Sequence, residues 1–158
     1  MAPSDAVERF LAAARSAGLD DLEVQRFPHG TRTAADAAAA VGCAVDQIVK
    51  SLVLEADDRA VLVLCSGSRR VDTDALAEHL DATHVAMASA DQVRSATGFA
   101  IGGTPPLGHP EPLDTLIDPH LLGFDVVYAA AGTPDSVFAV APGRLAEVAA
   151  ATPARVTG

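Results

Sequence analysis

The chain has 158 residues, of which 49% are hydrophobic and 4% aromatic, and its formal net charge at pH 7 is −10. This length and apolar content predict a single packed domain, and they exclude an intrinsically disordered chain. Because nucleic-acid-binding proteins that act alone are usually basic, the acidic balance disfavours strong binding to nucleic acid without a partner.

The first half of the sequence predicts helices and strands in alternation. Capping residues mark the helix ends: Asp5 begins the first helix and Gly18 ends it, while Thr33 and Gly42 bound the second. Two dense apolar runs flank the polar segment 57–59 and predict a β-hairpin. The other predicted elements are the strands 22–27, 48–54, 60–65 and 84–87 and the helices 73–80 and 89–98.

The second half opens with a loop over residues 98–112, which is rich in glycine and proline. Adjacent prolines stiffen such a loop, while glycines allow the backbone to approach other groups closely. Strands over 115–117, 125–129 and 136–140, a helix over 142–150 and a short terminal strand follow. Helices and strands are mixed and a hairpin is present, so we expect an α/β protein with a mixed sheet rather than a doubly wound parallel one.

The sequence also predicts where the protein is found. Its longest apolar runs fall short of the ~20 residues that a membrane span needs. The segment 1–5 has neither the basic stretch nor the apolar region of a secretory signal. Cys43 and Cys65 lack metal-ligand spacing and are expected to be reduced thiols. We therefore expect a cytoplasmic protein with no membrane partner.

Lys50 is the only lysine in the chain, since the other ten basic residues are arginines. Strand alternation places it on the same face as Ile48, Leu52 and Leu54, where an apolar side chain is expected. A buried ammonium without a partner costs several kcal/mol or loses its proton. Lys50 is therefore a candidate catalytic or substrate-positioning amine. The alternative is a lysine whose stem packs on the core while its ammonium reaches water.

Gly102 and Gly103 form the second unusual feature, inside the glycine- and proline-rich loop. Adjacent glycines can present backbone N–H groups to an anionic or carbonyl oxygen, as an oxyanion hole does. The commoner alternative is a tight structural turn. The spacing does not fit a dinucleotide-binding motif, because no helix follows the glycines directly.

A series of short motifs spans residues 31–156. They are Gly42-Cys43, Gln47 to Leu52, Arg70-Val71-Asp72, the loop 97–109, Ile117-Asp118 and the turn from Ala130 to Pro134. In this order they resemble the YbaK/ProX family of trans-acting aminoacyl-tRNA deacylases. That family is related to the editing domain of bacterial prolyl-tRNA synthetases.

The resemblance implies one editing domain over residues 1–158, with a curled, barrel-like mixed sheet flanked by helices. It implies hydrolysis of the ester that joins a small wrong amino acid, such as alanine or cysteine, to the 3′ end of proline tRNA. It implies no metal ion and no organic cofactor. A prolyl-tRNA synthetase or another translation protein is the expected partner for substrate delivery, given the acidic charge.

The resemblance also assigns roles to residues. The essential lysine of the family falls on Lys50 and its glycine loop on Gly102 and Gly103, which are therefore the predicted catalytic residues. The predicted substrate-binding residues are Phe27, Thr31, Ser51, Ser66, Phe99, Thr104, Pro105, Pro106, His109, Ala130, Ala131 and Gly132. Ser51 stands where members that remove alanine often carry asparagine, which leaves the preferred amino acid open.

Some roles have two interpretations. His109 is a candidate for proton transfer, because the ordinary pKa of histidine lies near neutrality, and it is equally a candidate loop cap. Ser51 and Ser66 are candidate pocket hydroxyls, and neither lies in a nucleophile-elbow motif. Arginines 32, 69, 70, 94 and 144 either form a basic rim for phosphate or are ordinary surface charges.

Two other functions remain open from the sequence. One is a non-catalytic binding module that has kept the editing fold and its pocket. The other is an enzyme that uses Lys50 as a Schiff-base amine, with a carbonyl substrate or pyridoxal phosphate. The absence of a helix start suited to phosphate after Lys50 disfavours the second.

Overall fold

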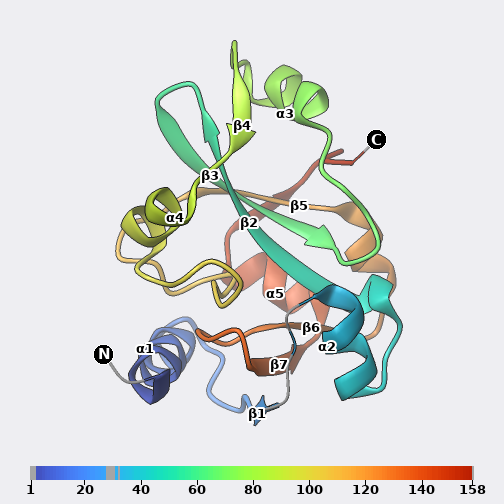
Figure 1. Ribbon diagram of the computed structural model, residues 1–158. Coiled ribbons are helices and arrows are strands. Elements are labelled where there is room, and N and C mark those ends of the chain that lie inside the picture. Colours follow the sequence, from blue (N-terminus) through green and yellow to red (C-terminus); the bar gives the residue numbers. More distant parts are fainter. Residues whose placement is uncertain (1–2, 28–30, 32, 158) are drawn as a thin grey trace.

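A long β-hairpin organises the structure, a computed structural model that describes residues 3–27, 31 and 33–157 (Figure 1). Strands β2 (Ile48–Ala56) and β3 (Arg59–Ser66) pair in antiparallel orientation across their whole length. Asp57 makes the turn with a φ of +54°, and its carboxylate accepts hydrogen bonds from the backbone N–H groups of Thr83 and His84. These bonds lower the pKa of the Asp57 carboxyl. The predicted hairpin is confirmed.

The other strands extend this hairpin into one mixed sheet of eight strands. The order is β1-β7-β6-β2-β3-β5-β8, and β4 pairs with β2. The pairs β2/β6, β3/β5 and β5/β8 are parallel, and the rest are antiparallel, which confirms the predicted mixed α/β class. The remaining strands are β1 (Val24–Arg26), β4 (Val85–Met87), β5 (Asp114–Ile117), β6 (Val127–Ala130), β7 (Ser136–Val140) and β8 (Ala151–Pro153).

Side-chain caps begin three of the helices, whereas the first helix begins at Pro3 and not at the predicted Asp5. Thr33 caps α2 (Ala34–Val41), Asp72 caps α3 (Thr73–Leu80) and Ser89 caps α4 (Ala90–Thr97), each by accepting a backbone N–H. Glycines in the left-handed conformation follow α2 and α4. The other helices are α1 (Pro3–Ser16) and α5 (Pro142–Val148), and two 3-10 helices that were not predicted are η1 (Val45–Gln47) and η2 (Pro119–Gly123).

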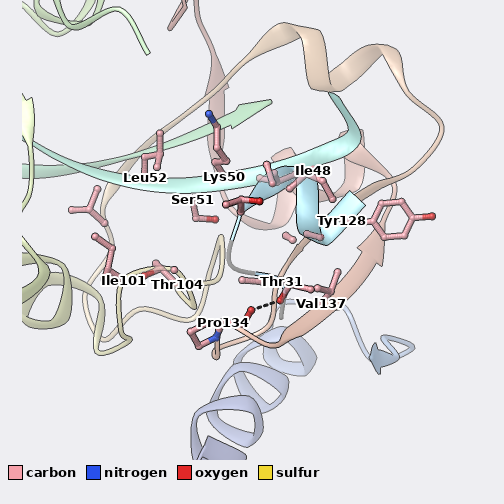
Figure 2. A pocket seen from close by; sticks show the side chains of 18 of the residues that line it. Thr31, Ile48, Lys50, Ser51, Leu52, Ile101, Thr104, Tyr128, Pro134 and Val137 are labelled. Carbon is pink, nitrogen blue, oxygen red and sulfur yellow. Dashed lines mark hydrogen bonds between the residues drawn. The ribbon is translucent and has the colours of Figure 1, made fainter. Parts of the chain in front are cut away.

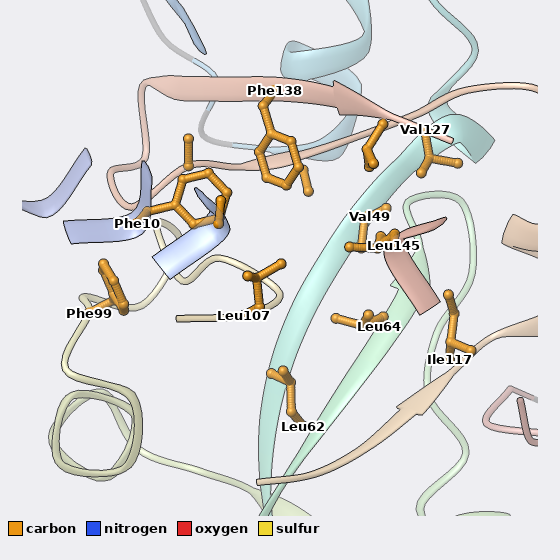
Figure 3. Packing of buried hydrophobic residues seen from close by; sticks show 14 of the residues in the cluster. Phe10, Val49, Leu62, Leu64, Phe99, Leu107, Ile117, Val127, Phe138 and Leu145 are labelled. Carbon is orange, nitrogen blue, oxygen red and sulfur yellow. The ribbon is translucent and has the colours of Figure 1, made fainter. Parts of the chain in front are cut away.

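The two faces of the hairpin pack into different cores. Val49, Val53, Leu62 and Leu64 lie in the larger core, shown in part in Figure 3. That core also contains apolar side chains of α1, α4 and α5, namely Phe10, Val93 and Leu145. The opposite face, with Leu54, Val61, Val63 and Cys65, packs against Leu76 of α3. The strand period of two thus decides which helix each residue of β2 meets.

Within the described ranges, no helix combines the length and the apolar content that a membrane crossing requires.

Asp118 links the end of β3 to the start of η2, and it is 2% exposed. Its carboxylate accepts the N–H of Ser66 at 3.3 Å and that of His120 at 3.0 Å. We expect Asp118→Ala to lower the free energy of unfolding by about 1–3 kcal/mol, because a buried N–H loses its acceptor. Urea unfolding followed by circular dichroism measures this as a lower midpoint at unchanged slope.

Asp114→Ala is the matched control for that substitution. Its carboxylate pairs with Arg59 at 3.0 Å, but both side chains are more than half exposed. Such a surface pair contributes about 0–1 kcal/mol. Equal losses in the two variants would mean that the buried Asp118 bonds do not stabilise the fold as we describe.

Candidate functional site

The candidate site is a pocket of about 340 Å³ along strand β2 (Figure 2). All residues from Ile48 to Val53 line it. Its other walls come from the start of α2, the end of β4, the glycine loop and the turn after β6. These lining residues are Thr31, Thr33, Ala34, Ala37, Met87, Ala88, Val93, Ile101, Gly102, Thr104, Tyr128, Ala129, Ala130, Pro134, Ser136 and Val137.

The pocket exists because the side of β2 that faces away from β3 is only partly paired. Strand β6 pairs with Ile48 and Val49, and strand β4 pairs with the segment from Leu54 to Ala56. Ala88 adds one bond, from its N–H to the carbonyl of Val53. Lys50, Ser51 and Leu52 have no recorded strand partner on this side within the described chain. The sheet therefore has a gap between β4 and β6, and the pocket occupies it.

Ser51 presents its backbone to this gap. In an antiparallel pair, alternate residues direct their N–H and C=O groups to opposite sides of the strand. The carbonyl of Ile48 accepts from Gly67, beside β3, and the carbonyl of Val53 accepts from Ala88, on the other side. Even-numbered residues of β2 thus bond β3. Ser51 is odd-numbered, so both of its main-chain polar groups point into the pocket.

The hydroxyl of Ser51 is also without a partner. Its Oγ is buried and makes no hydrogen bond among the described residues. The other pocket hydroxyls differ: Thr31 donates to the carbonyl of Pro134, and Thr104 donates to that of Ala100 at 3.1 Å. A buried polar atom without a partner costs about 1–3 kcal/mol, which a bound polar group would offset.

Lys50 lies on the opposite side of β2 from Ser51 (Figure 2). Part of the residue lines the pocket, while its ammonium donates to the carbonyl of Arg69. The residue is half-buried. In the described part of the chain, Lys50 is the only charged residue of the pocket lining.

Cys65 is the cross-strand neighbour of Lys50, and its thiol is not a nucleophile at neutral pH. Burial raises the pKa of Cys65 to about 11, even though the nearby Lys50 ammonium lowers it. At pH 7 only about one thiol in 10⁴ is therefore ionised. Cys65 is therefore not a candidate for a covalent intermediate.

The two glycines of the loop have different surroundings. Gly102 lines the pocket and is exposed, with a φ of +85°. Gly103 is buried, and a Cβ there would lie 2.7 Å from the backbone of Thr133. The loop thus rests directly on the turn that follows β6. Gly103 supports this wall without lining the pocket.

Of the predicted site residues, the structure places six along the pocket: Thr31, Lys50, Ser51, Gly102, Thr104 and Ala130. The others lie outside its lining: Phe27, Ser66, Phe99, Gly103, Pro105, Pro106, His109, Ala131 and Gly132. Ser66 donates to the carbonyl of Asp46 at 2.7 Å. Gly132 packs against α1, where a Cβ would lie 2.7 Å from the carbonyl oxygen of Ala6.

The contacts of His109 fit a loop cap. Its Nε2 lies 2.9 Å from the carbonyl oxygen of Pro105, and its ring meets Phe99 edge-on with centroids 6.5 Å apart. Burial lowers the pKa of the imidazole, so it is neutral at pH 7. His109 lies away from the pocket lining and is not placed for proton transfer there.

Sequence reasoning missed the apolar mouth of the pocket. Met87 is 50% exposed and Ile101 54% exposed, and they are the exposed large hydrophobics of the described chain. Both line the pocket, together with Tyr128 and Val137. No local pattern in the sequence signals these positions, because the strands and loops that carry them meet only in the folded sheet.

Two of the arginines named as a possible rim bond other parts of the protein. Arg144 bonds the carbonyl of Gly18 at 2.7 Å and pairs with Asp21, and Arg69 bonds Thr157. Arg70 and Arg94 are exposed, and Arg32 lies outside the described residues.

A half-enclosed pocket with mainly apolar walls, one lysine and a free strand edge in a mixed α/β sheet is typical of a protein that binds a small ligand. Comparison with known proteins identifies the class. Residues 29–148 match the family model described as the aminoacyl-tRNA editing domain. The chain belongs to this family, as its motifs predicted.

Individual relatives agree with this assignment. The uncharacterised protein YwhH of Bacillus subtilis is 27% identical over 126 residues, which cover 79% of this chain and 80% of YwhH. The proline–tRNA ligase of Moorella thermoacetica is 32% identical over 79 residues, covering 50% of this chain and only 14% of the ligase. The chain therefore matches a small part of that enzyme.

Solved structures share the whole fold. The crystal structure of a proposed trans-editing enzyme for prolyl tRNA synthetase has a TM-score of 0.93 and 40% identity, and covers 100% of this chain and 99% of its own. The hypothetical protein APE2540 has a TM-score of 0.86 and 27% identity, and covers 95% and 99%.

The contact between Gly103 and Thr133 predicts a stability loss. We expect Gly103→Ala to lower the free energy of unfolding by about 1–3 kcal/mol, because the added methyl overlaps backbone atoms that cannot move away alone. Gly143→Ala is the control: nothing lies within 4 Å of a Cβ there, inside α5, and a gain of about 0.5–1 kcal/mol is expected. The urea midpoints of the two variants measure these changes in stability. A Gly103→Ala midpoint equal to that of the wild type would show that the loop does not rest on the turn.

Proposed function

We propose that this protein hydrolyses the ester between a small wrong amino acid and the 3′ end of proline tRNA, as a trans-acting editing enzyme. The observation that carries the proposal is the pocket itself. It joins one lysine, a free strand edge and small apolar walls in a chain of the aminoacyl-tRNA editing family. The likeness to a proposed trans-editing enzyme over the full chain supports action without a covalently attached synthetase.

The walls of the pocket favour an uncharged side chain. Ala34, Ala37, Ala129 and Ala130 contribute only methyl groups, and no carboxylate of the described chain lines the pocket. A cationic amino-acid side chain would thus be buried without a counter-charge, at a cost of several kcal/mol. Alanine and cysteine meet these limits, and so does a small hydroxylated residue facing Ser51.

The reaction is an ordinary ester hydrolysis. The oxygen of a water adds to the ester carbonyl carbon, and the bond from that carbon to the ribose oxygen breaks. One proton of the water ends on the ribose oxygen, which yields a free amino acid and an uncharged tRNA. Negative charge grows on the carbonyl oxygen on the way, so fixed donors and cations near it accelerate the reaction.

Lys50 is the cation for this site. Its ammonium donates to the main-chain carbonyl of Arg69, on the face of β2 opposite Ser51. In the proposed complex, rotation about the flexible stem of Lys50 brings the ammonium to a ribose or phosphate group at the pocket mouth. A lysine acts on such groups as a compact point charge. The Gly102 main chain, at the wall of the pocket, orients the attacking water or the ester.

The protein places no general base in the described pocket lining, since no carboxylate and no imidazole is there. The proton of the attacking water therefore passes to a group of the substrate, such as the neighbouring ribose hydroxyl, or to solvent. Positioning and charge stabilisation then account for the rate, and effective molarity supplies much of it.

The apolar mouth gives the last nucleotide a surface. Met87 and Ile101 line the pocket and expose apolar area, against which the face of a nucleobase can pack. The net charge of −10 opposes binding to the rest of the tRNA. A partner from the translation apparatus, a prolyl-tRNA synthetase above all, is therefore expected to deliver the substrate.

Deacylation assays test the proposal directly. We expect the wild type to hydrolyse proline tRNA charged with alanine or cysteine and to leave correctly charged proline tRNA largely intact. Lys50→Met keeps the stem but removes the charge, and should lower kcat/KM by about 10²-fold or more while the urea midpoint stays within error. Arg70→Met is the control, because it removes an exposed cation outside the pocket.

Each other outcome has a definite meaning. Equal activity of Lys50→Met and the wild type would contradict the role of Lys50. No hydrolysis of any of these esters, even with a prolyl-tRNA synthetase present, would contradict the proposed reaction and favour a binding module that kept the pocket.

The charge argument makes a separate prediction about delivery. At near-physiological salt, we expect the affinity for proline tRNA to be weak and to rise at least about 10-fold when a prolyl-tRNA synthetase is added, as for linked binding sites. Fluorescence anisotropy of labelled tRNA measures this, with a non-cognate synthetase as control. Tight binding of tRNA by the protein alone would contradict the need for a partner.

A further inference from the structure

We propose that the free peptide edge of Ser51 anchors the aminoacyl group as a one-residue β-strand: its carbonyl accepts the α-ammonium and its N–H donates to the ester carbonyl. This inference rests on the proposed function and assigns the atoms that hold the substrate. It follows from the hydrogen-bond pattern of β2, independently of any side chain that performs chemistry.

The first step is that the main chain of Ser51, on the side of β2 away from β3, has no strand partner among the described residues. Strand β4 ends at Met87, and the chain turns into α4 directly after Ala88 bonds Val53. Strand β6 ends at Ala130 and enters the turn toward Ser136. Between them the N–H and C=O of Ser51 have no recorded strand partner in the residues described. Such an unpaired edge is a template for an added strand.

The second step is the match to one amino acid. In an antiparallel sheet, a hydrogen-bonded pair of residues exchanges both of its N–H···O=C bonds. A single aminoacyl ester carries one amine donor and one carbonyl acceptor at the spacing of one residue. It therefore satisfies both groups of Ser51 when it lies antiparallel to β2, in the direction of β4. In a parallel orientation the two bonds go to two different residues, which one amino acid cannot supply.

The third step concerns the side chain of the substrate. Residues directly opposite one another in a hydrogen-bonded pair send their side chains to the same face, with Cα atoms about 5.5 Å apart. The substrate side chain then lies beside the buried, unpartnered Oγ of Ser51, on the side of β2 where Thr104 and Ile101 lie (Figure 2). A hydroxyl or thiol on the substrate would supply the missing partner of that oxygen.

The fourth step concerns the ester and Lys50. The bound substrate runs antiparallel to β2, so the position that follows the amino acid lies opposite Lys50. A group at that position points to the other face of the sheet. The ribose that follows the ester carbonyl takes that position. The free edge thus delivers the scissile bond to the face on which the Lys50 ammonium lies. The N–H of Ser51, already bonded to the ester carbonyl, is also a donor for the charge that develops there.

Two esters of the same tRNA test the anchor. Alanyl-tRNA and propionyl-tRNA differ only in the α-amine, and each enzymatic rate is divided by the spontaneous hydrolysis rate of the same ester. We expect the acceleration to be about 10- to 100-fold lower for the propionyl ester, since one charge-assisted hydrogen bond is lost. Equal accelerations would overturn the anchor and leave the deacylase function intact.

Two variants test the N–H. Ser51→Pro removes a donor that bonds no strand, so the protein should remain folded while its acceleration falls by about 10²-fold or more. Ser51→Ala keeps the N–H, so its acceleration of alanyl-tRNA hydrolysis should exceed that of Ser51→Pro by about 10-fold or more. Leu52→Pro removes a donor to β3 instead and should unfold the protein. A folded Ser51→Pro with wild-type rate would overturn the anchor.

A binding measurement covers the case in which no ester is hydrolysed, which would contradict the proposed function. The probe is 3′-alanylamido-3′-deoxyadenosine, compared with its propionyl analogue. We expect the alanyl compound to shift the amide resonance of Ser51 and to bind about 10-fold or more tightly than the propionyl compound. Equal binding of the two, or no shift at Ser51, would contradict the anchor whatever the protein's activity.

Discussion

The incomplete pairing of β2 is the constraint on which the site depends. One side of this strand is bonded to β3 over its full length, which fixes its register and the direction of every main-chain group. The other side meets β6 at one end and β4 at the other. Buried backbone groups are almost always hydrogen-bonded in folded proteins. A gap of this kind is stable only where water or a ligand completes the bonds.

The elements beside the gap are held apart by ordinary capping and turn chemistry. Ser89 and Gln92 form a capping box that turns the chain away from β2 directly after β4. On the other side, Thr133 and Ser136 bond each other in the turn that ends β6, and Gly103 packs on that turn. Of these five residues, only Ser136 belongs to the described pocket lining. The pocket is therefore shaped by residues whose first role is structural, which explains why several predicted site residues lie outside its lining.

The sequence predicted what depends on near neighbours. Thr33 and Gly42 bound a helix, and the hairpin follows from two apolar runs around a polar turn, because caps and turns need only local contacts. The same alternation placed Lys50 on an apolar strand face. The gap could not be predicted, since it depends on where β4 and β6 leave β2. For that reason the backbone of Ser51 and the apolar mouth at Met87 and Ile101 appear only in the folded chain.

A site anchored on main-chain atoms separates two tasks. The amine and the ester carbonyl are common to every aminoacyl-tRNA, so a strand edge that binds them does not distinguish one amino acid from another. Discrimination must then come from the walls, and one methylene in an apolar pocket is worth only about 1–3 kcal/mol. Apolar walls can exclude a side chain that is too large by overlap, but they cannot exclude a smaller one. A polar wall atom such as the Ser51 hydroxyl adds the discrimination that size lacks, because a substrate without a matching group leaves that atom buried and unpaired.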